Sequence, residues 1–253
     1  MTHSGVSPSR GEEKLDITLS SVGQLWQTST RREFFRVAAI GGSAILLPAM
    51  FAGCGDDGGT QAPVDPTPTD TVVLDLSSDP GVLNYAYALE QLEAAFYTQV
   101  TQAFYSGITA EEQQILTDIR DHEVIHRDFL AGALGSARIP DLAVDFAGGN
   151  VDFGSRFSVL STARIFEDGG VAAYNGAGKL LKDVNNLLVA GKIVSVEARH
   201  AAAIRDLLRP GSRDFAGDDV VDPSGLDQAI EPGFVLQDSG LGQYITTPID
   251  IIS

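Results

Sequence analysis

Hydrophobic residues between positions 79 and 209 recur every three or four residues, and this pattern predicts four long helices. Asp79, followed by a proline, is suited to cap the first helix, which we expect to span about 80–105. A glycine ends that helix, and the sequence TAEEQQ that starts at Thr109 has the Thr-x-x-Glu form of a capping box. A second helix should therefore run from Thr109 to Leu134.

The rest of the pattern predicts two further helices and an irregular end. Residues 136–156 are rich in glycine and too long for a tight hairpin, which favours a crossover between two helical hairpins. We expect the third helix over 157–190 and the fourth over 192–208, with Gly191 as the break between them. The prediction is an all-α fold, a four-helix bundle of up-down-down-up order with a long crossover. Residues 210–253 are expected to form an irregular tail that packs on the bundle.

The first part of the chain has the features of an export signal. Residues 30–36, TRREFFR, precede an apolar run that ends in small residues and Cys54. This order resembles a twin-arginine signal that closes in a lipobox, although Phe51 stands where leucine is usual. The resemblance implies that residues 1–54 form the signal region, with a lipid attached to Cys54. The alternative is a membrane anchor over 37–53, near the lower length limit for a membrane span.

Composition limits the remaining classes of function. Residues 55–78 are predicted to be a flexible linker, because Gly, Pro, Asp and Thr dominate their first part. Cys54 is the only cysteine of the chain, which excludes intramolecular disulfides and thiolate metal clusters. The 34 acidic residues outnumber 17 basic ones, which form no stripe. This balance argues against nucleic acid as a partner.

Two Glu-x-x-His pairs carry the candidate chemistry. Glu123 with His126, and Glu197 with His200, each place a carboxylate and an imidazole on one face of a predicted helix. One such pair alone is ordinarily explained as a solvated polar face. Two pairs in a chain with 4 histidines exceed the number expected by chance. The repetition favours a metal site, with a metal-free buried polar network as the alternative.

Each pair needs a further carboxylate from the preceding helix. Glu167 is followed after seven residues by Tyr174, and Glu90 is followed by Tyr97 at the same spacing, so the two halves of the chain align. Glu93 is the competing choice, which we rank below Glu90 and regard as a supporting or shifting carboxylate. Packing in the core is as good an explanation of the two tyrosines as a redox role.

Three other residues of the predicted helices leave their roles open. His122 lies one turn before the first histidine of the pairs, and we expect it at the rim of the site because the ligand set is already full. Gly169 and Gly170 follow the third glutamate directly. They either let a neighbouring helix approach or open a path for substrate.

Four glutamates and two histidines distributed in this way form the ligand set of di-iron and di-manganese carboxylate bundles. Residues 80–209 resemble the ferritin-like superfamily, and the stretch VLNYAYALEQLEAAFY resembles its exported, desiccation-related branch. The resemblance implies two Fe ions, or alternatively Mn, with Glu123 and Glu197 as bridging carboxylates and Tyr97 and Tyr174 in catalytic positions. The implied metal ligands are Glu90, Glu123, His126, Glu167, Glu197 and His200.

The same resemblance implies redox chemistry of the oxidase, peroxidase or ferroxidase type, acting on oxygen, peroxide or ferrous ion. A non-catalytic scaffold of the cell envelope, active in stress or desiccation, is the alternative, so the sequence leaves open whether the protein is an enzyme. We expect export by the twin-arginine pathway, a lipid anchor in the cell envelope, and leave homo-oligomer formation open.

Overall fold

A computed structural model describes residues 71–238 and 240–253 of the chain. The predicted signal, the lipid attachment at Cys54 and residues 55–70 of the predicted linker lie outside the described residues. Within the described ranges, no helix combines the length and the apolar character that crossing a membrane requires.

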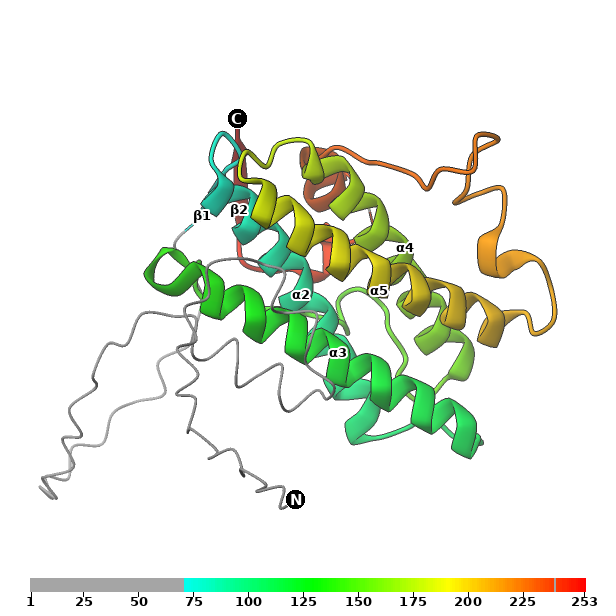
Figure 1. The fold of residues 1–253 in the computed structure, drawn as a ribbon. Coiled ribbons are helices and arrows are strands. Elements are labelled where there is room, and N and C mark those ends of the chain that lie inside the picture. Colours follow the sequence, from blue (N-terminus) through cyan, green and yellow to red (C-terminus); the bar gives the residue numbers. More distant parts are fainter. Residues whose placement is uncertain (1–70, 239) are drawn as a thin grey trace, which may run out of the picture. The chain divides into compact units, whose positions relative to one another are not determined.

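Four long helices form the fold (Figure 1). Helix α2 (Asp79–Gln102) packs against α3 (Ala110–Leu134), and α4 (Arg156–Gly178) packs against α5 (Val184–Leu208). Residues 135–155 cross over from the first pair to the second. The predicted all-α, four-helix bundle is confirmed.

The boundary predicted between the third and fourth helices is wrong. We expected a helix over 157–190, but α4 ends at Gly178 and α5 already begins at Val184. Gly191 therefore lies inside α5 and does not separate two helices. The apolar pattern continues through the connection, which is why periodicity alone did not show it.

Hydrogen bonds from a distant helix explain where this boundary lies. The Asp79 carboxylate accepts from the backbone N–H groups of Lys182 and Asp183 at 2.8 and 2.9 Å. Asp183 in turn caps α5 by accepting from the backbone N–H of Asn185 at 2.8 Å. Asp79, the predicted cap of the first helix, is thus the first residue of α2. The cap is Ser78, whose hydroxyl accepts a hydrogen bond from a backbone N–H of the first turn.

The capping box predicted for α3 is confirmed. The Thr109 hydroxyl accepts from the backbone N–H of Glu112 at 3.1 Å, and the Glu112 carboxylate accepts from the backbone N–H of Thr109 at 3.0 Å. The same carboxylate accepts from Arg156 Nε at 2.7 Å, which ties the start of α3 to the start of α4.

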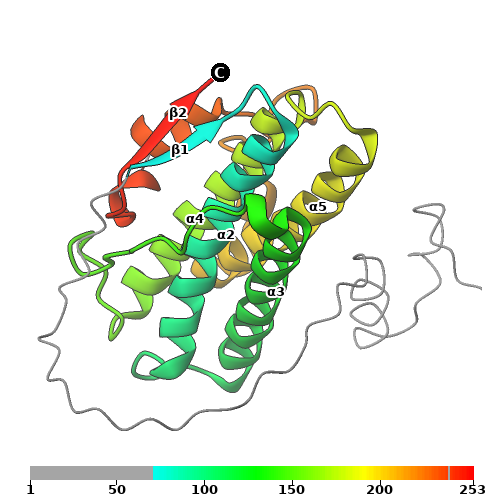
Figure 2. The same ribbon diagram turned by 90° about the vertical axis from the view of Figure 1, so that its left-hand side faces the viewer.

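Two short strands join the ends of the described domain (Figure 2). Strand β1 (Val72–Asp75) pairs in parallel with β2 (Ile249–Ile252), with Val72 opposite Ile249. The last part of the predicted linker and the end of the predicted irregular tail therefore have regular structure. Short turns of helix complete the fold: η2 (Gly135–Ala137), η3 (Asp214–Ala216), the π turn η4 (Phe234–Asp238) and η5 (Gly242–Tyr244).

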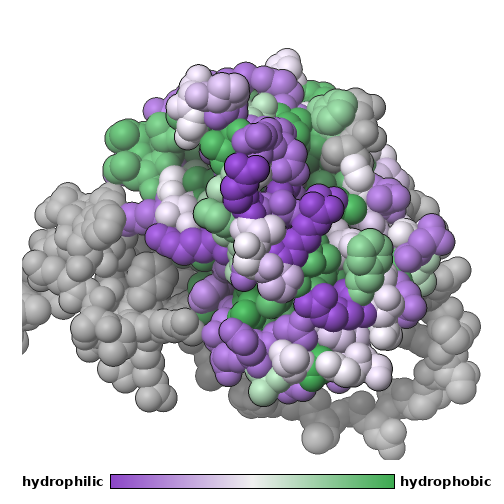
Figure 3. All heavy atoms as spheres, turned by 90° about the vertical axis from the view of Figure 1, so that its right-hand side faces the viewer, coloured by the Kyte–Doolittle hydropathy of each residue, from purple (hydrophilic) through white to green (hydrophobic). Residues whose placement is uncertain are grey.

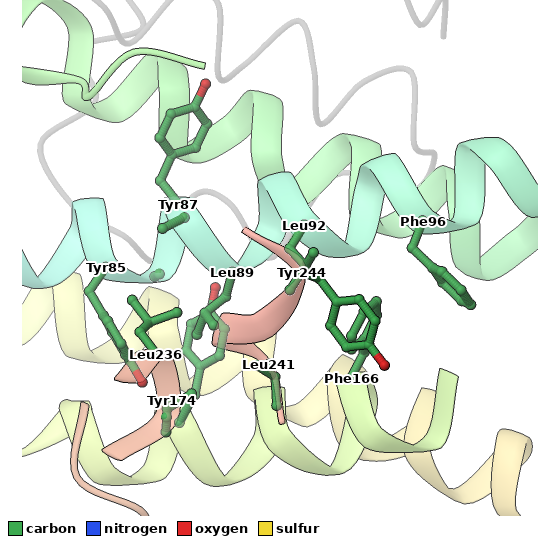
Figure 4. Packing of buried hydrophobic residues seen from close by; sticks show 14 of the residues in the cluster. Tyr85, Tyr87, Leu89, Leu92, Phe96, Phe166, Tyr174, Leu236, Leu241 and Tyr244 are labelled. Atoms are coloured by element: carbon green, nitrogen blue, oxygen red, sulfur yellow. The ribbon is translucent and has the colours of Figure 1, made fainter. Parts of the chain in front are cut away.

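The C-terminal segment supplies part of the hydrophobic core (Figure 4). The ring of Tyr244 packs edge-on against Phe166, with centroids 5.0 Å apart, and Phe166 packs edge-on against Phe96 at the same distance. A Cβ atom on Gly169 would lie 2.5 Å from the Cδ1 atom of Leu241. This glycine therefore makes room for the close approach of the C-terminal segment.

A buried arginine fastens the same segment to the second helix pair. The Arg205 side chain is 5% exposed. It donates two hydrogen bonds to Asp168 of α4 at 2.8 and 2.7 Å and two to Asp219 at 3.1 and 2.8 Å. Removal of this guanidinium would leave acidic groups of two elements without their counter-charge.

The surface carries hydrophilic and hydrophobic residues side by side. Hydrophilic residues cover much of the face in Figure 3, and smaller hydrophobic areas lie beside them. Phe157, Phe215 and Leu226 are among the large hydrophobic side chains that are exposed. The polar groups with the most unusual environment lie elsewhere, in the interior of the bundle.

Candidate metal centre

All four helices direct acidic or imidazole side chains into the centre of the bundle, where water does not reach them. The four predicted glutamate ligands are 0% exposed, and the two histidines are 4% and 9% exposed. The structure thus brings together all the predicted ligands: Glu90 from α2, Glu123 and His126 from α3, Glu167 from α4, and Glu197 and His200 from α5.

These side chains form two overlapping groups. Within each group, one potential ligand atom of every member lies within 4.8 Å of those of the others. Glu90 and His126 belong only to the first group, and Glu167 and His200 belong only to the second. Glu123 and Glu197 belong to both. The cluster is therefore compatible with a dinuclear metal site in which two carboxylates are shared.

The oxygens of each shared carboxylate are divided between the two imidazoles. Glu123 Oε1 lies 2.8 Å from His200 Nδ1, and its Oε2 lies 3.7 Å from His126 Nδ1. Glu197 is arranged in the opposite sense, with Oε1 2.7 Å from His126 Nδ1 and Oε2 3.4 Å from His200 Nδ1. This placement, with one oxygen on each side, suits a carboxylate that bridges two cations.

The remaining two glutamates are each held by a tyrosine from the opposite helix pair. Tyr97 of α2 donates a hydrogen bond to Glu167 Oε1 of α4 at 2.5 Å. Tyr174 of α4 reaches toward α2 (Figure 4) and donates to Glu90 Oε1. Both phenols are buried, and both lie beside the cluster as well as in the core. Each one orients a carboxylate so that its second oxygen faces the cluster.

Ten buried atoms around the cluster have no hydrogen-bond partner in the described residues. They include both oxygens of Glu123 and Glu197, but only the Oε2 atom of Glu90. The Nδ1 atoms of the two histidines are also among the unpartnered atoms, although carboxylate oxygens lie 2.7 and 2.8 Å from them. Buried polar groups are nearly always paired, so such a concentration of oxygen and nitrogen atoms fits bound cations. The complete set is Glu90 Oε2, Glu93 Oε1 and Oε2, Glu123 Oε1 and Oε2, His126 Nδ1, Glu167 Oε2, Glu197 Oε1 and Oε2, and His200 Nδ1.

In the metal-free protein, protons inside the cluster offset its negative charge. Burial raises the pKa of the Glu123 carboxyl well above its usual range and that of Glu167 to about 7. Burial acts in the same direction on Glu197, but the imidazoles of His126 and His200 outweigh it and lower this pKa to about 2. Burial disfavours the charged form of His126, yet the surrounding carboxylates raise its pKa to about 12. A cation that enters must displace such protons, so its affinity should fall as the pH falls.

A seventh acidic or imidazole side chain, Glu93, lies beside the cluster without belonging to either group. It is 1% exposed, and burial followed by the charge of Glu123 raises the pKa of its carboxyl well above the usual range. A Cβ atom on Gly170 would lie 2.9 Å from Glu93 Oε1, so this glycine leaves the space that the carboxyl fills. The structure places Glu90 among the grouped atoms and Glu93 outside them.

His122 is closer to the cluster than the sequence suggested. It is half-buried, and its Nδ1 atom lies 2.9 Å from Nε2 of His200, the nitrogen that faces away from the carboxylates. The expectation of a rim position therefore missed a direct contact with one of the predicted ligands. The spacing of four residues between His122 and His126 was the available signal, because it places both on one face of α3.

Comparison with known families agrees with the fold and the geometry. Residues 78–210, just over half of the 253 residues, match the ferritin-like domain family. This stretch contains all four helices and every residue of the two groups. The chain therefore belongs to the ferritin-like domain family, as its resemblance indicated. A comparison with curated proteins found no match.

Proposed function

We propose that this protein binds two iron ions, with manganese as the alternative, and carries out redox chemistry of the oxidase, peroxidase or ferroxidase type. The main support for this proposal is a difference among the four central glutamates in how many of their carboxylate oxygens have a hydrogen-bond partner. Glu123 and Glu197 each leave two buried oxygens unpartnered, whereas Glu90 and Glu167 each leave one and place the other on a tyrosine. Two bridging and two terminal carboxylates would account for this division. Oxygen and imidazole ligands without sulfur suit Fe or Mn.

A bound metal pair would supply two electrons in one step to an oxidant. The chain itself would hold and orient the pair. Tyr97 and Tyr174 keep the terminal carboxylates in place through their hydroxyl protons, and helices α3 and α5 each present a glutamate and a histidine at i and i+3. The complete burial of the four glutamates excludes bulk water from their oxygens.

A small apolar cavity lies against Tyr174, one of the two tyrosines beside the cluster. Its volume is about 20 Å³, enough for one molecule of about the size of water. Its lining includes Tyr174, Leu89, which is next to Glu90 in the chain, Leu130, which lies one turn after His126, and Ile193. An apolar wall of this kind suits a small nonpolar molecule such as dioxygen.

We further propose export by the twin-arginine pathway and attachment to the cell envelope through a lipid on Cys54, as in the desiccation-related branch of the superfamily. The support is the order of basic, apolar and small residues before Cys54. Cys54→Ser should release the protein into the soluble fraction after export. If the variant stays in the membrane fraction, residues 37–53 act as an anchor and the lipid is not needed.

Metal content tests the proposal of a metal site directly. Protein purified after native export should contain about two Fe or Mn ions per chain by elemental analysis. Glu123→Ala and His200→Ala should each lower this content, whereas Glu111→Ala, which removes an exposed acidic group from the same helix as Glu123, should leave it unchanged. Oxygen, peroxide and ferrous ion are then compared as substrates of the loaded protein. A wild-type protein without metal, equal in stability to the Glu123→Ala variant, would support the scaffold function.

A further inference from the structure

The two halves of the candidate metal centre are built alike, except for one side chain behind the histidines. Glu123 and His126 on α3 correspond to Glu197 and His200 on α5, and the glutamates held by tyrosines correspond in the same way. The residue directly before the first pair is His122, whereas the residue before the second pair is Val196. Both are half-buried. The two halves therefore differ in a group that can make a hydrogen bond.

His122 extends from α3 across to the histidine of α5. Its Nδ1 atom lies 2.9 Å from His200 Nε2. The two ring planes are 10° from parallel, and their centroids are 5.1 Å apart. The contact holds the ring of His200 from the side opposite the carboxylates.

The positions of the carboxylates decide which nitrogen of His200 would bind a metal. His200 Nδ1 lies 2.8 Å from Glu123 Oε1, 3.4 Å from Glu197 Oε2 and 3.5 Å from Glu167 Oε2. A nitrogen that binds a metal carries no proton, so the ring proton belongs on Nε2. The Nε2–H group then donates to His122 Nδ1, and this hydrogen bond fixes both the tautomer and the rotation of the ligand.

His126 has no such support among the described residues, where its Nε2 atom makes no hydrogen bond. Its side chain is 11% exposed, against 5% for the side chain of His200. The valine that corresponds to His122 cannot accept a hydrogen bond. With a metal ion on Nδ1, the Nε2–H group of His126 would therefore lack the acceptor that holds the ring of His200 in the binding tautomer.

We propose that His122 is a positioning residue that makes the two metal positions unequal, so that the position formed by Glu123, Glu167, Glu197 and His200 binds its ion more tightly and fills first. The inference rests on the proposed metal binding but goes beyond it, since two equal positions would serve the proposed function as well. Partners of this kind typically change metal affinity by about 10–100-fold.

The test uses the full-length protein, stripped of metal and supplied with one Mn²⁺ per chain. Anomalous scattering from crystals gives the occupancy of each position, and electron paramagnetic resonance during a titration separates single ions from coupled pairs. In the wild type, the first equivalent should occupy the His200 position and give the spectrum of an isolated ion. His122→Val, which copies the other half of the chain, should lower the first affinity by about 10–100-fold and divide the ion between both positions.

Two further variants separate positioning from a general effect on folding. His122→Gln keeps an acceptor for the Nε2–H group and should restore most of the preference for the His200 position. Val196→His supplies the corresponding acceptor to the other half and should raise the affinity of the His126 position. The thermal midpoint of each metal-free variant shows whether it is folded.

Equal occupancy of the two positions in the wild type would overturn this inference and leave the proposed function intact. An unchanged preference in folded His122→Val would overturn it as well. A wild-type protein that binds no Mn²⁺ or Fe²⁺ would overturn the proposed function and this inference with it.

Discussion

Glutamine substitutions of the central glutamates should separate shared ligands from terminal ones by their effect on metal-dependent stability. Glu123 lies in both groups, whereas Glu167 lies in one. Burial raises the pKa of the Glu123 carboxyl well above its usual range, which favours its neutral form in the metal-free protein. Glutamine has nearly the same shape and no charge. Glu123→Gln should therefore leave the metal-free fold close to the wild type and act on the metal-bound form.

The expected magnitude follows from the linkage between binding and unfolding. A ligand at about 100 times its Kd stabilises the folded state by about 2.7 kcal/mol, so two independent ions give about 5 kcal/mol. For a domain of this size, 1 kcal/mol shifts the Tm by about 2–4 °C, which predicts a rise of about 10–20 °C on addition of metal. Glu167→Gln weakens one position and should lose about half of this rise. Glu123→Gln weakens both and should lose nearly all of it.

Differential scanning calorimetry with and without Fe²⁺ under anaerobic conditions measures these shifts. Glu111→Gln is the matched control, because it removes an exposed acidic group of α3 and should keep the full rise. If Glu123→Gln and Glu167→Gln lose equal fractions of the rise, Glu123 is not a shared ligand. The assignment of bridging and terminal carboxylates would then be wrong.

Four other perturbations test the description of the fold. Gly191→Ala should stabilise the protein by about 0.5–1 kcal/mol in urea denaturation, because a Cβ there meets no atom within 4 Å inside α5; a loss of stability would instead favour a helix break. Gly176→Ala should destabilise it in the same assay, since the new Cβ would lie 1.8 Å from a backbone oxygen. Tyr97→Phe removes the donor to a buried carboxylate oxygen and should cost about 1–3 kcal/mol in the metal-free protein; no change would mean that the oxygen finds another partner. Burial favours the neutral form of Glu112, but hydrogen bonds from the backbone and from Arg156 lower its pKa below 4.5. The stabilisation by ionised Glu112 is therefore complete above pH 4.5 and is lost as the pH falls through the lower folded-state pKa. The difference in the free energy of unfolding between the wild type and Glu112→Gln should shrink in acid and vanish at the lowest pH.

The candidate site was largely predictable because its spacing is local. A chelating pair at i and i+3 depends only on helical geometry, and the repetition of Glu123 with His126 as Glu197 with His200 marked it. The spacing of Glu90 to Tyr97 aligned the first helix with the third. Spacing alone could not show that each tyrosine donates a hydrogen bond to the glutamate of the opposite half, as Tyr97 does to Glu167.

Long-range contacts account for what the sequence left undetermined. The boundary between α4 and α5 depends on Asp79, which accepts hydrogen bonds from backbone groups more than 100 residues away. The side chain that Gly170 accommodates, Glu93, lies on a different helix. His122 contacts His200 only because α3 and α5 are neighbours in the bundle. Such contacts form only in the folded chain, and the periodicity of the sequence does not predict them.

The pairing of β1 with β2 gives the last residues of the chain an influence on the first helix of the bundle. Asp75, at the end of β1, accepts a hydrogen bond from the backbone N–H of Ser78, the cap of α2, and its carbonyl oxygen lies where a Cβ on Gly81 would be. Proteolytic trimming from Ile249 onward would remove the partner of β1 and loosen this turn. The helix that would then fray from its start carries Glu90, so damage at the C-terminus should reach the candidate metal ligands through the backbone.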